Sequence, residues 1–306
     1  MNSDMQDTWH PGERMVQTRA GVNEKMSKLG PRVIRNYMLD QHRKFFASLP
    51  MVITGSQDEN ENVWAYPLFG DPGFIQSPTP ELLSIKSPMS HAGPALPQLN
   101  TRSQVGLLGI DLETRRRNRL NGTVLEKDHN GFTIGVEESF GNCPQYIQQR
   151  RLHTEPRDDE TTTEYVDRWS RPLRECITNA DTCFIASTFS SQHTNRNSGM
   201  DVSHRGGQRG FLGFDDRDRL IIPDFPGNSF FNTVGNLTLD PRAGLLFLDF
   251  SGGNIITLTM SAEIIWKTEN AAVCGDHDRV IRLSLKAGYV VRNALPYRWK
   301  TIVNPT

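Results

Sequence analysis

An arginine in a glycine-rich segment is the residue in this chain whose setting most suggests chemistry. Arg205 follows Ser203 and His204 and precedes Gly206 and Gly207 in the sequence DVSHRGG. A guanidinium presents a rigid fork of donors to a phosphate, and adjacent glycines let the backbone approach an oxygen closely. The alternative is a Gly-Gly turn that carries an exposed arginine, and spacing alone leaves both interpretations open.

A connection crowded with short polar side chains follows, in the sequence IIPDFPGNSFFNTVGNL from Ile221 to Leu237. Its polar residues are Asp224, Asn228, Ser229, Asn232, Thr233 and Asn236. Such side chains offer donors and acceptors that suit a sugar phosphate or the edge of a heterocycle. They also favour turns for purely local reasons, so the segment is either part of a binding site or a plain turn.

The first half of the chain has a basic run of its own, DLETRRRNRLNG. On a strand, alternation places Arg115 and Arg117 on one face and Arg116 on the other. We expect at least one of them to point inward or toward an anion, and the others to form a solvated face, as charge runs usually do. Further along, SFGNCPQY contains Asn142, a candidate helix N-cap, and Cys143. Cys143 is either a reactive thiol at a helix N-terminus or a small buried residue.

Composition excludes several classes of protein. The 306 residues include 34 Lys and Arg against 35 Asp and Glu, and this net charge of −1 gives no reason to expect nucleic acid or an anionic membrane as a partner. No apolar run approaches the roughly 20 residues that span a bilayer, and the polar N-terminus is not typical of a signal peptide. We therefore expect a cytoplasmic protein with reduced cysteines. The sequence has no CxxC, HExxH, GxSxG or Walker motif, so we expect neither a metal site nor a hydrolase of a familiar type.

Strands must position most of these residues. Short apolar runs separated by Gly, Pro, Asp and Asn dominate the chain and predict strands joined by turns. Helical periodicity is confined to three segments, residues 22–49, about 145–152 and about 165–178. Residues 1–21 are expected to be a tail. Its apolar residues Trp9, Met15 and Val16 are the ones that could pack against the rest of the protein. The polar segment 153–165 is expected to be a linker.

The second series of apolar runs repeats the first. The matched segments, in the same order in both halves, are 51–53 with 183–185, 70–75 with 207–212, 83–85 with 220–222, and 106–111 with 244–249. Antiparallel sheets leave costly edges that closure into a barrel removes, and two covalently joined copies would pack as an internal pseudo-dimer. We therefore expect a mainly β (α+β) fold of two tandem six-stranded antiparallel barrels with a few flanking helices, in residues 1–155 and 156–306.

The two copies differ where chemistry is expected. Leu68 stands in the first copy at the position that Arg205 has in the second, so the arginine does not belong to the duplicated scaffold. This difference favours a site that is present once per chain.

Several segments resemble the pyridoxamine 5'-phosphate oxidase-like FMN-binding split-barrel family, in its duplicated, long-chain subgroup. They are TCFIAS, DVSHRGG and LIIPDFPGNSFFNTVGNL in the second half, and VGLLGIDLETRRRNRLNG and SFGNCPQYI in the first. The resemblance implies six-stranded split barrels, FMN held between two barrels, and redox chemistry by the flavin. It also implies a flavin phosphate near Arg205 and a ring that lies against the strand around residues 183–187. The cofactor contacts that it implies are Arg205, Ser203, His204, Gly206, Ser187, Pro223, Asp224, Asn228, Asn232, Thr233, Arg115, Arg117, Asn142 and Cys143.

Two departures from the family bear on activity. The basic Ser-Arg-Lys segment with which the oxidase itself binds phosphate corresponds here to Phe231-Asn232-Thr233, and the oxidase's C-terminal arginine and histidine motif is missing. We therefore expect an FMN-dependent oxidoreductase of another substrate, not a true pyridoxamine 5'-phosphate oxidase, with FAD less favoured than FMN and no catalytic side chain assigned. A flavin carrier or sensor without turnover is the alternative, and a barrel that has lost its cofactor is a third interpretation.

The same family includes chains that continue into a module with an iron–sulfur cluster, and this sequence has no cysteine set for one. We therefore expect a small-molecule substrate or an electron-transfer partner to supply the electrons. Pairing of chains into a homodimer stays open.

Overall fold

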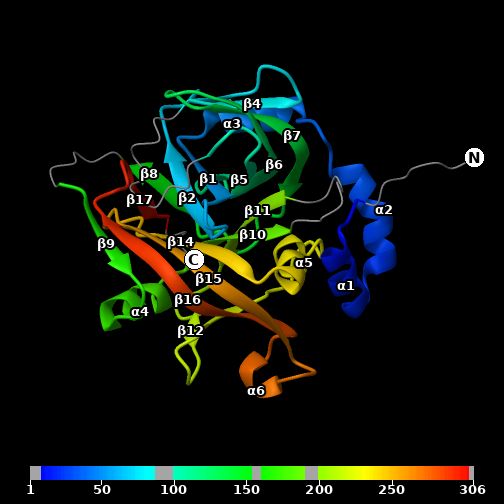
Figure 1. The fold of residues 1–306 in the computed structure, drawn as a ribbon, viewed down its shortest axis with the longest axis vertical. Helices are drawn as coiled ribbons and strands as arrows, with labels where there is room; N and C mark the ends of the chain where they lie inside the picture. The colour runs from blue at the N-terminus through cyan, green and yellow to red at the C-terminus, as the bar shows by residue number, and fades with distance from the viewer. Residues whose placement is uncertain (1–7, 87–98, 154–159, 190–198, 303–306) are drawn as a thin grey trace, which may run out of the picture.

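Two large antiparallel sheets dominate the computed structural model, which describes residues 8–86, 99–153, 160–189 and 199–302 (Figure 1). The strands of the first sheet are β1 (Met51–Gln57), β2 (Val63–Phe69), β3 (Ile75–Gln76), β4 (Leu82–Ile85), β5 (Gln104–Asp111), β6 (Arg116–Lys127) and β7 (Phe132–Asn142). The strands of the second are β9 (Thr162–Val166), β10 (Thr182–Phe189), β11 (Gly199–Gly206), β12 (Gly213–Phe214), β13 (Leu220–Pro223), β14 (Arg242–Leu248), β15 (Ile255–Trp266) and β16 (Arg279–Arg292). A third, small sheet pairs β8 (Arg150–His153) with β17 (Arg298–Thr301).

The two large sheets have the same topology. The first has the strand order β2-β1-β5-β6-β7-β4-β3, and the second has β11-β10-β14-β15-β16-β13-β12, with β9 added against β16. Each strand of the first sheet therefore has a counterpart in the second, taken in chain order from β1 with β10 to β7 with β16. The internal repeat that the sequence predicts is present in the strand order.

Strand registers show which residues correspond between the halves. Gly55 pairs with Ala65 and with Gly106, while Ala186 pairs with Val202 and Gly244. Three residues along the same strands, Leu68 takes the place of Arg205, as the sequence comparison predicts. The same registers match Val52 with Cys183, so the predicted match of 51–53 with 183–185 is wrong by one residue. Short apolar runs alone do not determine register, because neighbouring hydrophobic residues look alike in either frame.

The expectation of two six-stranded units is corrected to sheets of seven and eight strands. The additional strands are short or polar. β3 and β12 have two residues each, and β9 lies within the Thr-rich segment that we expected to be a linker. β9 is mostly exposed and pairs with β16 outside the main strand order, and it lacks the apolar alternation that marks a strand in sequence.

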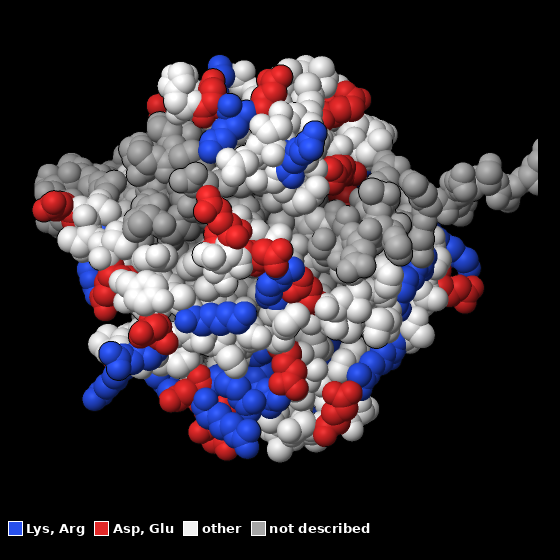
Figure 2. All heavy atoms as spheres, in the orientation of Figure 1, with Lys and Arg blue, Asp and Glu red and all other residues white. Residues whose placement is uncertain are grey.

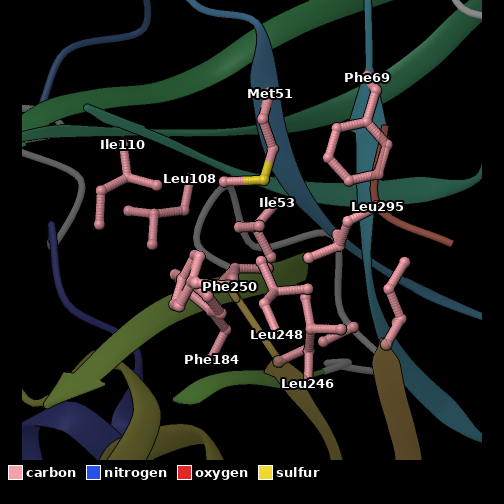
Figure 3. Close-up of a cluster of buried hydrophobic side chains, with 14 of the residues drawn as sticks. Met51, Ile53, Phe69, Leu108, Ile110, Phe184, Leu246, Leu248, Phe250 and Leu295 are labelled. Atoms are coloured by element: carbon pink, nitrogen blue, oxygen red, sulfur yellow. The ribbon is translucent and has the colours of Figure 1, made fainter. Parts of the chain in front are cut away.

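The two halves pack against each other through a shared core. Met51 and Leu108 of the first half meet Phe184 and Leu246 of the second, all fully or almost fully buried (Figure 3). Glycines permit the closest approach. A Cβ on Gly106 would lie 2.8 Å from the Met200 carbonyl oxygen, so β5 lies directly against β11. Gly244 of β14 makes the corresponding contact with the backbone of β2, so the interface repeats with approximate twofold symmetry.

Six helices are found among the described residues, and several differ from expectation. They are α1 (Pro11–Arg19), α2 (Asn23–Val33), α3 (Asp40–Ser48), α4 (Arg171–Thr178), α5 (Asn232–Leu239) and α6 (Ala271–Cys274). The helical prediction for 22–49 corresponds to α2 and α3. The predicted helix at 145–152 is wrong, because that segment forms a turn followed by β8.

The described part of the predicted tail contains a docked helix. The His10 side chain accepts from the Gly12 amide and the Glu13 carboxyl accepts from the His10 amide, which together form a capping box that starts α1. Trp9 and Val16 are buried, whereas Met15 is exposed. α1 lies beside α5 (Figure 1).

Acidic and basic side chains are interspersed over the face shown in Figure 2, in keeping with the near balance of charge in the sequence. Among the described residues, no helix has both the length and the apolar character to cross a bilayer.

Candidate functional site

A cavity lies between the two halves, where the first sheet meets β11 and the start of α5. Its volume is about 100 Å³, and with the adjoining open solvent the space not filled by atoms is about 740 Å³. The first half lines it with Arg117, Arg119, Asn142, Cys143, Gln145 and Tyr146. The second half lines it with Ser203, His204, Arg205, Gly206, Asp224, Phe225, Pro226, Gly227, Asn228, Ser229, Phe231, Asn232 and Thr233. Most of the residues predicted to contact a cofactor therefore come together here.

Strand alternation in β6 places two arginines at the cavity. Arg117 and Arg119 are two residues apart on the strand and both line the cavity. Arg116 points elsewhere, stacks over the Phe45 ring at 4.4 Å and donates to a backbone carbonyl. Arg115 lies before the strand at a φ of 56° in an exposed turn and does not line the cavity. The pair that alternation brings to the site is therefore Arg117 with Arg119, and Arg119 was missed by the sequence analysis.

Arg119 joins the two halves at the inner end of the cavity. The side chain is almost fully buried, and its Nη1 donates to Asp201 Oδ1 at 2.9 Å and to Asn232 Oδ1 at 2.8 Å. Its Nη2 donates to Ser203 Oγ at 2.6 Å, and Ser203 Oγ lies 2.6 Å from Thr233 Oγ1. Its buried Nε has no hydrogen-bond partner among the described residues. Arg119 thus draws β6, β11 and the first turn of α5 together and keeps one donor free.

Arg205 lines the cavity and shares a carboxylate with a second arginine. Its Nη1 lies 2.5 Å from Asp224 Oδ1, and Arg279 Nε lies 2.6 Å from Asp224 Oδ2. Asp224 is buried, and the buried Nε of Arg205 is unpartnered among the described residues. Two guanidinium groups therefore face one carboxylate, which leaves one positive charge uncompensated.

Arg117 has no carboxylate partner among the residues that the structure describes. Its Nε donates to the Cys143 carbonyl at 2.9 Å, and its Nη1 lies 3.1 Å from His204 Nδ1. Burial, with the nearby charges of Arg119 and Arg205, lowers the pKa of Arg117 to about 10, so it stays charged at neutral pH.

His204 is a neutral donor in this arrangement. Burial, together with the charges of Arg117, Arg150 and Arg205, lowers its pKa well below the usual value. Because Arg117 donates to Nδ1, we assign the ring proton to Nε2. This Nε2 is buried and has no partner among the described residues.

The charges around the cavity favour an anion. Arg117, Arg119 and Arg205 line it together with the carboxylate of Asp224. Next to this lining, Arg119 pairs with Asp201 and Arg279 pairs with Asp224. The four positive and two negative charges leave an excess of two positive charges. Asn232 and Thr233 of the first turn of α5 also line the cavity, and a helix N-terminus attracts negative charge.

Aromatic side chains close the outer part of the cavity. The rings of Tyr146 and Phe225 stack at 5.2 Å between centroids, and the Tyr146 hydroxyl donates to the Pro226 carbonyl. Phe231, directly before α5, has a left-handed backbone with a φ of 61°, and its ring packs against the Arg279 guanidinium. These rings provide a flat apolar surface next to the cationic one.

Three predicted contacts lie outside the cavity. Ser187 is fully buried in β10, where it accepts from Asn236 Nδ2 at 3.0 Å, and it does not line the cavity. Pro223 ends β13 and is buried, and Arg115 is exposed. No residue of the 183–187 strand lines the cavity, so the cavity gives no support to the predicted ring position against that strand.

Asn142 and Cys143 line the cavity in a setting that differs from the prediction. Asn142 is the last residue of β7 and a turn follows it, so it does not cap a helix. Cys143 is exposed, so the interpretation of a small buried residue is wrong. It also lacks the helix N-terminus on which the reactive-thiol interpretation rests.

The position related to this cavity by the internal repeat is apolar. Leu68 and Trp64 stand there in place of Arg205 and Asp201, and Thr257 stands in place of Arg119. Trp64 packs on Tyr289, with ring centroids 5.8 Å apart. The cationic set is therefore present at one of the two related positions.

The sequence signals for the missed residues were weak. Arg119 lies two residues after Arg117 and therefore on the same face of the strand, and this spacing was the signal that could have identified it. Asp201 and Arg279 gave none, because their roles depend on partners far away in sequence. Among the described residues, no group of three or more His, Cys, Asp or Glu side chains is arranged to hold a metal ion.

Comparisons with known proteins identify no family for this chain. No family model matches the chain, and no curated protein matches it. Among solved structures, the chain is similar to a "putative pyridoxamine 5'-phosphate oxidase" from Corynebacterium glutamicum, with 10% identity, a TM-score of 0.29, and coverage of 44% of this chain and 96% of that one. It is also similar to MrkH of K. pneumoniae in complex with c-di-GMP, with 10% identity, a TM-score of 0.25, and coverage of 83% and 87%. Both similarities are distant, and neither carries an argument about function.

Proposed function

We propose that this protein binds FMN in the cavity between its two halves and that it is an FMN-dependent oxidoreductase. One observation carries the proposal: Arg117, Arg119 and Arg205 line the cavity at the start of α5, and among the described residues that line it Asp224 is the one carboxylate. The excess of two positive charges matches the charge of a phosphate monoester near neutral pH.

The donors at the cavity fit such a group. Arg119 Nε, Arg205 Nε and His204 Nε2 are buried donors that lack partners among the described residues, and a buried donor without an acceptor is costly. In this proposal Arg119, Arg205, Thr233 and the amides of α5 hold the phosphate. The aromatic surface of Tyr146 and Phe225 provides an apolar contact for a planar ring system.

The bound flavin would supply hydride or electron chemistry, and the protein would bind it, orient it and limit the access of water. His204, held neutral with its proton on Nε2, is the side chain best placed to donate a hydrogen bond to a heteroatom of the ligand. We assign no residue to proton transfer.

A carrier or sensor without turnover is the second candidate. Asp201 and Asp224 are both held in ion pairs with arginines, so neither is well suited to act as a general base. This favours binding without turnover.

Visible absorption tests the binding. The purified protein is mixed with FMN and desalted, and the released small molecule is identified by mass spectrometry. Retention of the flavin absorption bands and release of FMN support the proposal, whereas a colourless protein after incubation with excess FMN would refute it. Sustained oxidation of NADH or NADPH by the loaded protein would then favour the enzyme, and bound flavin that is never reduced would favour the carrier.

A further inference from the structure

Helix α1 and the residues before it pack behind the cavity and contact the segment that leads into α5. The rings of Trp9 and Phe230 lie 5.1 Å apart, and Gln17 Nε2 donates to the Phe230 carbonyl at 3.2 Å. Phe230 comes just before Phe231 and Asn232, which line the cavity. The described N-terminal segment is thus in contact with the wall of the candidate site.

The backbones of α1 and α5 touch. A Cβ on Gly12 would lie 2.2 Å from the Gly235 carbonyl oxygen, and a Cβ on Gly235 would lie 2.7 Å from the Glu13 amide nitrogen. No side chain fits between the helices at this point. Glu13 is therefore brought to the first turn of α5 with little freedom to move.

The Glu13 carboxyl is buried and contacts a residue of the cavity. Asn232 Nδ2 donates to Glu13 Oε1 at 2.5 Å, and the His10 amide donates to Glu13 Oε2 at 3.0 Å. The opposite end of the same amide, Asn232 Oδ1, accepts from Arg119 Nη1 at 2.8 Å. Because a carboxyl in this position accepts from the NH₂ group, it fixes which end of the Asn232 amide faces Arg119.

The surroundings favour an uncharged acid at Glu13. Burial raises its pKa well above the usual range, and the neighbouring Glu138 and Asp201 raise it further, against the hydrogen bonds from His10 and Asn232. A neutral amide is therefore a close substitute for this side chain in both charge and volume.

We propose that Glu13 is a positioning residue of the anion site, which acts through Asn232 to hold Arg119 at the cavity. The proposal rests on the proposed function, since it names a residue that prepares the same site for the FMN phosphate. The sequence predicts a tail for residues 1–21, whereas in the structure α1 lies within this range and supports the cavity wall through Asn232.

Two substitutions of similar volume separate positioning from packing. Glu13→Gln keeps an acceptor oxygen for Asn232, and Glu13→Leu removes it. The matched control is Glu24→Leu, at an exposed residue of α2 that pairs with Lys28 on the surface. We expect Glu13→Leu to raise the Kd for FMN roughly tenfold, the effect of one lost hydrogen bond, and Glu13→Gln and Glu24→Leu to change it by less than about threefold.

A double-mutant cycle tests the route. If Glu13 acts through Asn232, Glu13→Leu adds no further loss in an Asn232→Ala background. Full additivity of the two effects, or equal Kd values for the leucine and glutamine variants, would overturn the proposal. Thermal unfolding gives a separate readout, because replacement of a buried carboxyl by leucine need not lower the Tm while the affinity falls.

Hydrogen exchange keeps this test independent of the proposed function. Without ligand, the amides of the first turn of α5 should exchange faster in Glu13→Leu than in the wild type, Glu13→Gln or Glu24→Leu. If wild-type protein does not bind FMN and this difference is seen, the proposed function fails and the positioning role of Glu13 stands. If exchange is the same in all four proteins, the positioning role is refuted.

Discussion

Removal of the Arg205 guanidinium is the perturbation whose effect the structure defines best. Arg205 lines the cavity, and its one ion pair among the described residues is with Asp224, which Arg279 also holds. Arg205→Ala therefore leaves Asp224 paired, and the variant should fold with little loss of stability. The loss should fall on the ligand instead, because a charge-assisted hydrogen bond to phosphate disappears.

The size of the effect follows from that bond. Hydrogen bonds to charged groups contribute about 1.5–3 kcal/mol, and the competition of Asp224 for the same guanidinium favours the middle of this range, about 2 kcal/mol. Since about 1.4 kcal/mol corresponds to a factor of ten, the Kd for FMN should rise roughly thirtyfold.

Fluorescence titration with two ligands is the assay. FMN and riboflavin differ in the phosphate, so Arg205→Ala should weaken FMN and leave riboflavin unchanged. Arg115→Ala is the matched control, because it removes the same charge from an exposed turn outside the cavity. Equal weakening of both ligands would show that Arg205 contacts the ring or shapes the cavity. An unchanged Kd for FMN would refute the role of Arg205 in binding phosphate.

Three further predictions concern other parts of the structure. Burial, with Asp201 and Glu137 nearby and against the hydrogen bond from Asn121 and the charge of Arg119, raises the pKa of Glu138 to about 7. Between these pH values the folded state holds a proton that the unfolded state has lost. The free energy of unfolding should therefore fall as the pH rises from about 4.5 to about 7. Urea titrations of Glu138→Gln should show a smaller fall. Gly12→Ala should destabilise the protein by about 1–3 kcal/mol, because its Cβ would overlap the Gly235 carbonyl, whereas Gly213→Ala, in open space, should not; equal urea midpoints would contradict this. Arg117→Ala should free His204 Nδ1 and raise the pKa of the imidazole, which NMR titration of the ring protons measures. An unchanged pKa would show that Arg117 does not lower it.

The repeat and the main difference between its copies could be predicted from sequence. Leu68 and Arg205 lie at equivalent positions because Gly70 and Gly207, two residues after each, mark the same turn in both halves. Glycine-rich turns survive as landmarks, since few other residues suit them. The register of β1 against β10 could not be found in this way, because an apolar run has no such landmark.

The contacts that build the site were beyond the sequence. Arg119 meets Asp201 and Asn232 only because two sheets and a helix pack together, and no local pattern encodes that meeting. The segment that forms α5 was expected to be a connection between strands, either part of a binding site or a plain turn, since NSFFNTVGN is rich in residues that favour turns. Tertiary packing overrides such weak local preferences.

The N-terminal segment shows the opposite case, because its sequence contains a local signal for a helix. His10, Pro11 and Glu13 have the spacing of a capping box with proline in the first turn, which predicts a helix start. The polar composition around them suggested a tail instead. That Glu13 is buried could not be predicted, because its partner Asn232 is distant in the chain.

Counting the FMN molecules bound at saturation tests the central claim most directly. Equilibrium dialysis of the full chain against FMN should give one molecule per chain, because the cationic set is present at one of the two positions related by the repeat, and Arg119→Ala should remove this binding. Two molecules per chain, or none, would contradict the account.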